Sequence, residues 1–543
     1  MHMVLGLAAL FACKAVFALS DKANVLFIIW DDWRDDKYNK SSVTPTVEDL
    51  RKESFEFSNA FTAFPQCGPS RMSIMTGMHV HKHKTTVADF VGYGGSKMGI
   101  TGEPIQFSNA FESIPHYFKE QGWRIGIAGK IYHFPTNYFS PQSQLWFTYS
   151  DFNNTEIPPP TPDRFPFSNC PIGSKTKVCT CNDIADGKQG SCRDRHTAEN
   201  IKQWIREERD NSEPWFLLAG FIRPHLDFEV PKEFVGSIKQ SDVTTRREGN
   251  RNDMALINTL DQFTDSEIFQ SPSSFATSMQ SYATNIRYVD SLTNEILQTL
   301  KETGQYDNTI VVLTSDHGMT LGDRMDHFTK STILEESLRV PLIIKPALGI
   351  SLGKKIVWVV ESVDLFPTLI DMACPTCAKS TNSDGESLVS LMGNATTRIK
   401  DYAISVMQTC ESNASTRMRK SSCSLETDNG ADANGLVFSY RNAEYRYTEW
   451  MKTNPSTEKC HKINKTKACR RRNGCRFQQF ITEPKLSDNT RFFCMADVTT
   501  KEAIVDQPYL KELFRAKDNF LIDSYSVVST VSLARANWRT YYS

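Results

Sequence analysis

The sequence predicts an α/β fold with a large, mostly parallel central sheet flanked by helices, and three observations favour it. Short, continuous apolar runs recur along the chain, which is the pattern of strands covered on both faces. Segments with apolar residues at helical spacing lie between these runs, and such alternation is typical of a parallel sheet with helices on its faces. Polar residues follow the runs, at the strand ends where open α/β sheets bind ligands.

Four apolar runs are the candidate strands of this sheet: residues 24–30 (NVLFIIW), 125–128, 216–221 and 310–315 (IVVLTS). The polar residues that follow them are Asp31 and Asp32, Lys130 and His133, Arg223 and His225, and Asp316 and His317. Because the carboxyl ends of parallel strands meet at one rim, we expect these side chains to lie together and the acids to share a divalent cation. Taken singly, each residue is more often a helix cap or solvated turn, a surface lysine or a loop histidine than part of a site. The four strand ends together favour a site.

Three segments between the strands have the apolar spacing of helices, namely 114–122, 198–209 and 286–301. From about residue 400 the composition changes to short strands, turns and cysteine-rich loops, with strand candidates at 402–407, 436–440 and 445–450. We therefore expect a signal peptide at 1–20, a catalytic domain at 21–399 and a smaller α+β C-terminal subdomain at 400–543.

The stretch from Phe64 to Gly77 (FPQCGPSRMSIMTG) places Cys67 before a predicted helix. Gly68 and Pro69 predict a tight turn directly after the cysteine, with the helix beginning at about Ser70. The amide groups at the start of that helix and the guanidinium of Arg71 would then favour an oxyanion such as sulfate or phosphate near Cys67. The alternative is a buried or disulfide-bonded cysteine ahead of an ordinary helix.

The first 20 residues contain an apolar run with Lys14 as its one charged residue, which predicts a signal peptide and no membrane span after its cleavage. We expect entry into the secretory pathway and a lysosomal or secreted protein. The 14 cysteines fit an oxidising compartment, and disulfides are favoured over zinc ligation for the cluster between Cys170 and Cys192. A net charge of -1 gives no bias toward nucleic acid. Acceptor sequons for glycosylation lie at Asn39, Asn153, Asn394, Asn413 and Asn464.

The pentapeptide CGPSR from Cys67 to Arg71, with Thr76 and Gly77 closing the same helix, resembles the signature of the sulfatase family. Other stretches carry the same resemblance in the same order, and within the family they are most similar to the iduronate-2-sulfatases. These are NVLFIIWDDWR, SIPHYFKEQGW, GKIYHF, FIRPHLDFEVPKEF, TSDHGMTLGD, RVPLII, VDLFPTL and YRYTEW.

The resemblance implies an alkaline-phosphatase-like fold, with an antiparallel sheet in the C-terminal subdomain, and a hydrolase that removes sulfate from sulfated glycans or glycosaminoglycans. It implies that a formylglycine-generating enzyme converts Cys67 to formylglycine, whose hydrated aldehyde is the nucleophile. One Ca²⁺ would be held by Asp31, Asp32, Asp316, His317 and the residue made from Cys67. The residues that bind and process sulfate would be Arg71, Lys130, His133, His225 and Lys330.

The chemistry of such a site requires a diol, because a thiol has no second hydroxyl from which to eliminate. One hydroxyl would attack sulfur while a protonated His225 or Lys330 assists the departing sugar oxygen. His133 would then take the proton of the second hydroxyl, which expels sulfate and restores the aldehyde. Lys130 and Lys330 would hold the sulfate oxygens as charge accumulates.

Departures from the family pattern leave the substrate open. Gln66 before the cysteine is off the broad signature, and the stretch MTLGDRMDHFTKST, which contains Lys330, differs from the iduronate enzymes. For a uronate substrate, Arg223 and Arg324 are candidate cations for the carboxylate, with structural ion pairs as the alternative. Two other classes stay open: a phosphodiesterase or phosphonate hydrolase of the alkaline-phosphatase-like group, and a catalytically silent glycan-binding protein. Cys67 disfavours the first, and the full set of polar strand ends disfavours the second.

Overall fold

The computed structural model describes residues 22–34, 42–83, 112–132, 178–181, 192–243, 271–322, 328–347, 353–380, 382–393, 400, 402–411, 419–420, 435–443, 445–452, 476–482 and 493–495. The predicted signal peptide, the five sequons, His133 and Arg324 lie outside these residues.

A mixed eight-stranded sheet forms the centre of the molecule, in the order β10-β2-β11-β7-β1-β5-β3 with β12 paired to β2. Its strands are β1 (Asn24–Asp31), β2 (Phe55–Phe61), β3 (Arg124–Gly129), β5 (Trp215–Pro224), β7 (Thr309–Ser315), β10 (Arg339–Val340), β11 (Leu342–Lys345) and β12 (Lys354–Glu361). The four predicted strands are the neighbours β7-β1-β5-β3, and all three of their pairings are parallel. The prediction of a mostly parallel sheet is confirmed, with antiparallel β11 joining β7 to β2.

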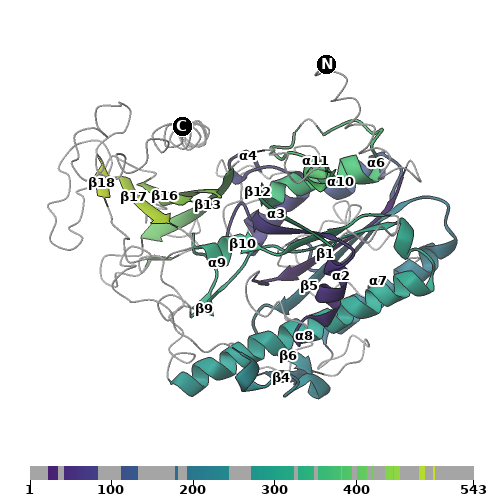
Figure 1. The fold of residues 1–543 in the computed structure, drawn as a ribbon, viewed down its shortest axis with the longest axis horizontal. Coiled ribbons are helices and arrows are strands. Elements are labelled where there is room, and N and C mark those ends of the chain that lie inside the picture. The colour runs from purple at the N-terminus through teal and green to yellow at the C-terminus, as the bar shows by residue number, and fades with distance from the viewer. Residues whose placement is uncertain are drawn as a thin grey trace, which may run out of the picture.

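Two layers of helices cover the sheet (Figure 1). One contains α2 (Pro45–Arg51), α7 (Arg193–Glu207) and α8 (Pro272–Glu302), and the other contains α3 (Cys67–Thr76), α6 (Ile114–Glu120), α10 (Leu365–Ala373) and α11 (Val389–Gly393). In β1, Leu26 and Ile28 enter the core on the first side, whereas Val25 and Phe27 enter the core on the second. This alternation explains the continuous apolar run, because both faces of the strand are buried. Among the described helices, none combines the length and apolar character needed to cross a membrane.

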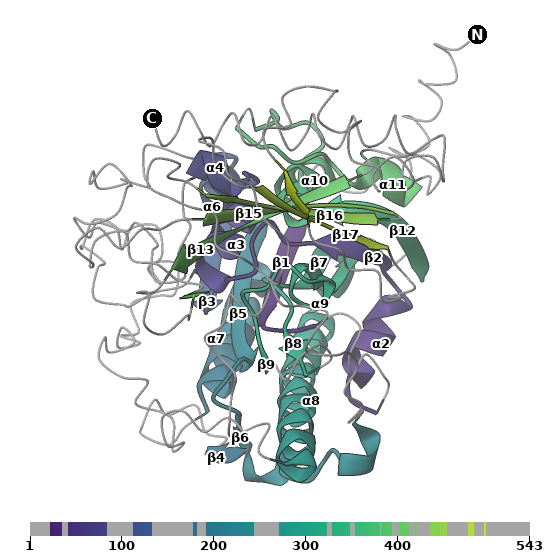
Figure 2. The same cartoon turned by 90° about the vertical axis from the view of Figure 1, so that its left-hand side faces the viewer.

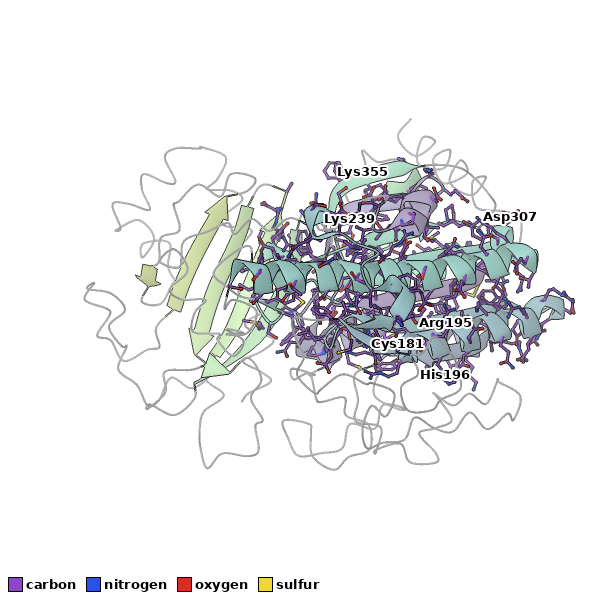
Figure 3. The ribbon with its side chains drawn as sticks, turned by 90° about the horizontal axis from the view of Figure 1, so that it is seen from below. Cys181, Arg195, His196, Lys239, Asp307 and Lys355 are labelled. Carbon is purple, nitrogen blue, oxygen red and sulfur yellow. A yellow bond between two sulfur atoms is a disulfide. The ribbon has the colours of Figure 1, made fainter. Side chains whose placement is uncertain are left out.

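Helices α7 and α8 begin earlier than their apolar spacing predicts. For α8, the predicted start at Ile286 is wrong because the polar first half is also packed: Phe275 and Met279 are buried, and the Ser271 side chain caps the helix by accepting from the Ser274 N–H at 3.1 Å. The two helices are joined by the carboxylate of Glu295, which pairs with Arg195 at 2.7 Å and Lys202 at 2.6 Å. Figure 3 shows Arg195 on this side of the molecule, with Cys181 close by.

Disulfides link Cys181 to Cys192 and Cys374 to Cys377. They confirm the choice of disulfides over zinc for those residues of the first cysteine cluster that the structure describes. Cys67 is the free cysteine of the described residues and is buried.

The predicted antiparallel sheet of the C-terminal part is present, in the order β14-β13-β15-β16-β17-β18. Its strands are β13 (Tyr402–Glu411), β14 (Arg419–Lys420), β15 (Gly435–Asn442), β16 (Tyr445–Lys452), β17 (Arg476–Thr482) and β18 (Phe493–Met495). It lies beside the large sheet in Figure 1 and in front of it in Figure 2. Strand β13 makes the contact: the Val406 N–H donates to the Ala63 carbonyl at 2.9 Å and Ser405 Oγ to the Thr62 carbonyl at 2.6 Å, directly after β2. A buried pair between Arg441 and Glu335, 3.1 Å apart, adds a second attachment.

Candidate active site

The carboxyl ends of β1, β3, β5 and β7 bring their polar residues to one rim, as the strand pattern predicts. Asp31 ends β1, Asp316 and His317 follow β7, and Lys130 follows β3. The side chains of Asp31, Asp316 and His317 are fully buried, whereas those of Lys130, His225 and Lys330 keep 16%, 29% and 22% exposure. The last three therefore form the side of the site that a ligand can reach.

Helix α3 begins at Cys67 itself, with Gln66 as its N-cap, so the predicted turn at Gly68 and Pro69 and the predicted start at Ser70 are wrong. The physical reason is that amide groups in a first helical turn have no intrahelical acceptor, so Pro69 loses no hydrogen bond as the third residue. The helix ends at Thr76 and is capped by Gly77, whose φ of 65° is left-handed and whose N–H donates to the Ser73 carbonyl. Cys67 thus sits on the first turn of a buried helix.

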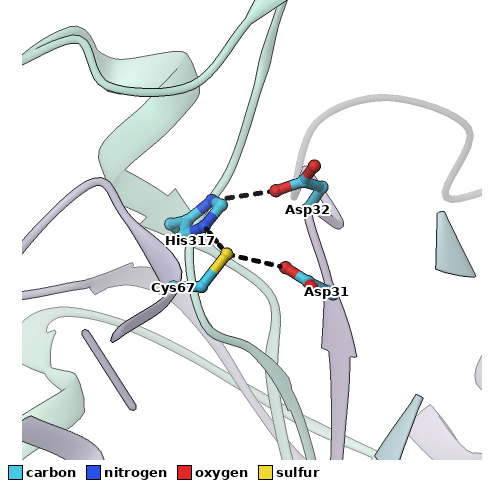
Figure 4. Close-up of side chains that lie close together, drawn as sticks. All are labelled: Asp31, Asp32, Cys67 and His317. Carbon is cyan, nitrogen blue, oxygen red and sulfur yellow. Dashed lines mark hydrogen bonds and ion pairs between the residues drawn. The ribbon is translucent and has the colours of Figure 1, made fainter. Parts of the chain in front are cut away.

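Cys67 is surrounded by both acids and cations. Its Sγ lies 3.4 Å from Asp31 Oδ1, 3.3 Å from His317 Nε2, 3.0 Å from Lys330 Nζ and 3.6 Å from Lys130 Nζ. Figure 4 shows dashed lines from the sulfur to Asp31 and to His317, with Asp32 above Asp31 and facing the imidazole. Lys330, which the resemblance implies to be a site residue, therefore lies beside the cysteine.

Arg71 lies one helical turn after Cys67 and is fully buried. Its Nε donates to Asp316 Oδ2 at 2.8 Å, and its Nη1 donates to the carbonyls of Lys130 and Ile131. Its Nη2 is buried without a hydrogen bond among the described residues and lies 3.9 Å from Asp31 Oδ2. A guanidinium held at two of its nitrogens, with a third donor available, fits an oxyanion or a hydroxyl group near position 67.

Asp32 adopts a left-handed backbone with φ of 65°, which is uncommon for a residue other than glycine. Side chains distant in sequence hold both of its peptide groups. The Asp32 N–H donates to Asp316 Oδ1 at 3.3 Å, and its carbonyl accepts from the Tyr282 hydroxyl at 2.7 Å. The same hydroxyl accepts from the Arg34 N–H at 3.0 Å. Sequence reasoning missed Tyr282, because nothing in helix α8 marks this tyrosine as different from a core residue.

Glycines bring the backbone of Lys130 against β5. The Lys130 N–H donates to the Gly220 carbonyl at 2.8 Å, and a Cβ at position 220 would lie 1.9 Å from the Lys130 carbonyl oxygen. Gly129 has a φ of 74°, and a Cβ there would lie 2.0 Å from the Gly220 oxygen. The close approach places Lys130 so that its Nζ pairs with Asp31 Oδ2.

Arg223 is a structural residue, and its interpretation as a cation for a substrate carboxylate is wrong. It is 3% exposed, its Nη2 pairs with Glu229 Oε2 at 3.0 Å, and its Nη1 donates to the His225 carbonyl at 2.9 Å. The Asp194 carboxylate accepts from the Ile222 and Arg223 N–H groups at 2.8 and 2.9 Å. These contacts fix the end of β5 and thereby the backbone that carries His225.

The site is close to electrical balance. The carboxylates of Asp31, Asp32 and Asp316 offset the cationic side chains of Arg71, Lys130 and Lys330. His317, whose pKa is raised, and Cys67, whose pKa is held well below its usual value against burial by Lys130 and Lys330, form a further pair of opposite charges. A divalent cation added to this set would leave an excess of positive charge for an anionic ligand.

Individual pKa values follow from burial and these neighbours. Burial favours the neutral carboxyl, but Lys130 holds the pKa of Asp31 well below its usual value. At Asp32, burial, reinforced by Asp31 and opposed by Lys330, raises the pKa to about 6. Burial and Lys330 lower the pKa of His225 well below its usual value, whereas Asp316 and Cys67 outweigh burial and raise the pKa of His317 to about 9.

The donor set fits a hard cation such as Ca²⁺. Asp31, Asp32, Cys67 and His317 each offer one ligand atom, and these atoms lie within 4.8 Å of one another. Two of the four groups are carboxylates, which suit a hard cation such as calcium, and the fit improves if the residue at position 67 offers oxygen in place of Sγ. Asp316 lies beside the cluster, with its Oδ2 bonded to Arg71 and 3.8 Å from His317 Nε2.

Comparison with known protein families identifies one matching model, described as sulfatase, over residues 23–374. Iduronate 2-sulfatase from Mus musculus is 27% identical over 412 residues, covering 65% of this chain and 69% of that protein. The Homo sapiens protein of the same name is 27% identical over 406 residues with the same coverage. An arylsulfatase from Clostridium perfringens is 26% identical over 415 residues, covering 70% of this chain and 80% of its own.

Solved structures share the fold. A phosphonate monoester hydrolase from Silicibacter pomeroyi superposes with a TM-score of 0.60 at 18% identity, covering 93% of this chain and 96% of its own. A 2-O GAG sulfatase superposes with a TM-score of 0.56 at 17% identity, covering 94% of this chain and 93% of its own.

Proposed function

Since the chain belongs to the sulfatase family, we propose that it is a sulfuric ester hydrolase whose nucleophile is a formylglycine made from Cys67. The observation that supports this most is the position of Cys67 on the first turn of α3, with its Sγ 3.0 Å from Lys330 Nζ and 3.4 Å from Asp31 Oδ1. A nucleophile placed between cations and a buried carboxylate cluster is suited to attack on an anionic ester.

In this proposal Asp31, Asp32, Asp316, His317 and the residue at position 67 hold one Ca²⁺, which would polarise the nucleophile and sulfate oxygens. The hydrated formylglycine would supply the attacking hydroxyl and a second hydroxyl for release of sulfate.

The remaining side chains bind sulfate and move protons. Lys130 and Lys330 pair with Asp31 and Asp32, the carboxylates proposed to hold the ion. Competition from an ion for those carboxylates would free both ammonium groups for the sulfate oxygens. Arg71 stays fixed by Asp316, and its Nη2, which is buried 3.9 Å from Asp31 Oδ2, would be available to donate to a sulfate oxygen.

His225 and Lys330 are the candidates for protonating the leaving oxygen, since both are on the exposed side of the site. His225 is neutral in the free protein because its pKa is lowered, and an anionic ester beside it would favour its protonated form. His133, which we propose takes the proton of the second hydroxyl, lies outside the described residues.

For the substrate we propose a sulfated glycan, with 2-O-sulfated iduronate as the first candidate. The iduronate 2-sulfatases of mouse and human support it, at 27% identity. The burial of Arg223 removes one of the two cations expected to bind the uronate carboxylate. We further propose a catalytic domain at 21–399 with a C-terminal subdomain at 400–543, maturation by a formylglycine-generating enzyme, and a lysosomal or secreted location.

The test is peptide mass spectrometry of the Cys67 peptide together with kinetics on two substrates. Protein from a host with the generating enzyme should contain formylglycine at position 67 and hydrolyse a 2-O-sulfated uronate oligosaccharide with higher kcat/KM than an aryl sulfate. Cys67→Ser should abolish turnover, because serine has one hydroxyl. Full activity with unmodified cysteine would refute the nucleophile, and preference for a phosphonate monoester would refute the sulfatase activity. Preference for the aryl sulfate would refute only the uronate.

A further inference from the structure

We propose that Gln66 is a positioning residue that, together with Ser331, holds Lys330 against the reacting residue at position 67. The proposal rests on the proposed function, because it assigns Gln66 a part in the same reaction. Gln66 is the residue at which the chain departs from the broad signature, and Lys330 and Ser331 lie within the other divergent stretch, residues 319–332. In the structure these two regions are in direct contact, because the Gln66 side chain donates a hydrogen bond to Ser331.

Lys330 follows β9 (Phe328–Thr329), a two-residue strand that pairs with the equally short β8 (Thr320–Leu321). Its Nζ nevertheless lies 3.0 Å from both Cys67 Sγ and Asp32 Oδ1. A lysine has a long, flexible side chain and costs rotamer entropy to fix, so a stable position requires a backbone that is itself held.

Gln66 provides such an attachment from the nucleophile's own helix. As the N-cap of α3 it makes no side-chain capping bond, and its Nε2 donates instead to Ser331 Oγ at 2.9 Å. The Ser331 N–H donates to the Pro65 carbonyl at 3.0 Å. Both side chains are buried, so the bond is shielded from water.

Ser331 also adopts a left-handed backbone, with φ of 62°, which a serine rarely adopts unless its surroundings impose it. The two bonds to residues 65 and 66 are contacts that impose it. On the other side, Thr332 Oγ1 bonds to Ser337 Oγ at 2.7 Å, and the Ser337 carbonyl accepts from the Gly318 N–H beside His317. The segment that carries Lys330 is therefore tied to the nucleophile helix at one end and to the His317 loop at the other.

The experiment uses Gln66→Met, Ser331→Ala and the double variant in the full chain. Gln66→Met removes the amide with little change in volume. Ser331→Ala removes the acceptor, keeps the Cβ at the left-handed position and leaves the sequence around Cys67 unchanged. Because Gln66 adjoins the modified cysteine, the formylglycine content of each protein is measured and rates are expressed per converted site.

The matched control is Ser54→Ala, which removes a buried hydroxyl that donates to the Leu50 carbonyl at 2.6 Å, away from the site. It should lower Tm by a similar amount and leave kcat unchanged, which separates positioning from general stability.

We expect each single variant to lower kcat roughly tenfold with a smaller change in KM, because small displacements of a group at the reacting centre are costly. The double variant should be no slower than the slower single variant, since both remove the same bond. Lys330 should also react faster with an amine-selective acetylating reagent, roughly fivefold, the change that corresponds to one buried hydrogen bond.

Additive losses of kcat, unchanged acetylation of Lys330, or an equal loss of kcat in Ser54→Ala would overturn the proposal. If the wild-type protein hydrolyses no sulfate ester, the proposed function fails, and the acetylation rate of Lys330 still decides whether Gln66 positions it.

Discussion

Replacing Tyr282 by phenylalanine should weaken binding of the proposed Ca²⁺, although the tyrosine supplies none of the ligand atoms. The Tyr282 hydroxyl donates to the Asp32 carbonyl at 2.7 Å and accepts from the Arg34 N–H at 3.0 Å, and the tyrosine is fully buried. Each buried hydrogen bond is worth about 1 kcal/mol net, so we expect the free energy of unfolding to fall by about 2 kcal/mol. Asp32 is also released from one of the contacts that hold its left-handed backbone.

Tyr282→Phe should also lower the affinity for the proposed cation, which a loss of stability alone would not do. Residues that orient metal ligands typically change metal affinity by about 10-fold to 100-fold when they are removed, and we expect Ca²⁺ affinity to fall by about 10-fold in Tyr282→Phe. Isothermal titration of the chelator-treated protein with Ca²⁺ measures the affinity, and urea unfolding measures the stability.

Tyr306→Phe is the matched control. Its hydroxyl also makes a hydrogen bond, to Glu53 Oε2 at 3.2 Å, but lies away from the carboxylate cluster. This variant should lose stability and keep its Ca²⁺ affinity. Wild-type affinity in Tyr282→Phe, or an equal loss of affinity in Tyr306→Phe, would refute the reasoning that the hydroxyl acts through Asp32.

Three other changes test the scaffold around the site. Gly220→Ala places a Cβ 1.9 Å from the Lys130 carbonyl oxygen. Urea unfolding should show that the free energy of unfolding falls by about 3 kcal/mol or more, and activity should fall as well. A variant with wild-type stability and activity would contradict the close approach. Burial raises the pKa of Asp290 to about 6, against bonds from neighbouring N–H groups, so its contribution to stability is fully present below pH 3.8 and is lost as pH rises through 6. Between pH 4 and 7 the unfolding free energy of Asp290→Asn should therefore rise relative to wild type by at most about 3 kcal/mol, whereas parallel pH curves would exclude this role. Lys400→Met removes the ammonium that pairs with the buried carboxylates of Glu361 and Asp364 at 2.5 and 2.6 Å. Urea unfolding should show that the free energy of unfolding falls by about 3 to 5 kcal/mol. The exposed control, Lys379→Met, should lose no more than about 0.5 kcal/mol, and an equal loss in both variants would contradict the role of the buried pairs.

The local sequence was enough to predict the central strands and the rim of the sheet at which the site lies. A strand buried on both faces must be apolar at every position, so the runs that became β1 and β7 could be recognised without a structure. The acids that follow them could be assigned to one rim because parallel neighbours end on the same side of a sheet. The stretch from Cys67 to Arg71 indicated an anion site, because the amide groups at the start of a helix and the guanidinium of an arginine both favour an oxyanion.

The contacts that hold this rim together were decided by the tertiary structure alone. Tyr282 lies 250 residues from Asp32, and Ser331 lies 265 residues from Gln66, so no local pattern states that these pairs meet. The same limit explains why the sequence left two interpretations of Arg223 open. Its pairing with Glu229 inside the protein could not be seen from the sequence, which shows a charge but not its partner. Residue types and their spacing are local properties of the chain, whereas burial and pairing depend on which distant segments the fold brings into contact.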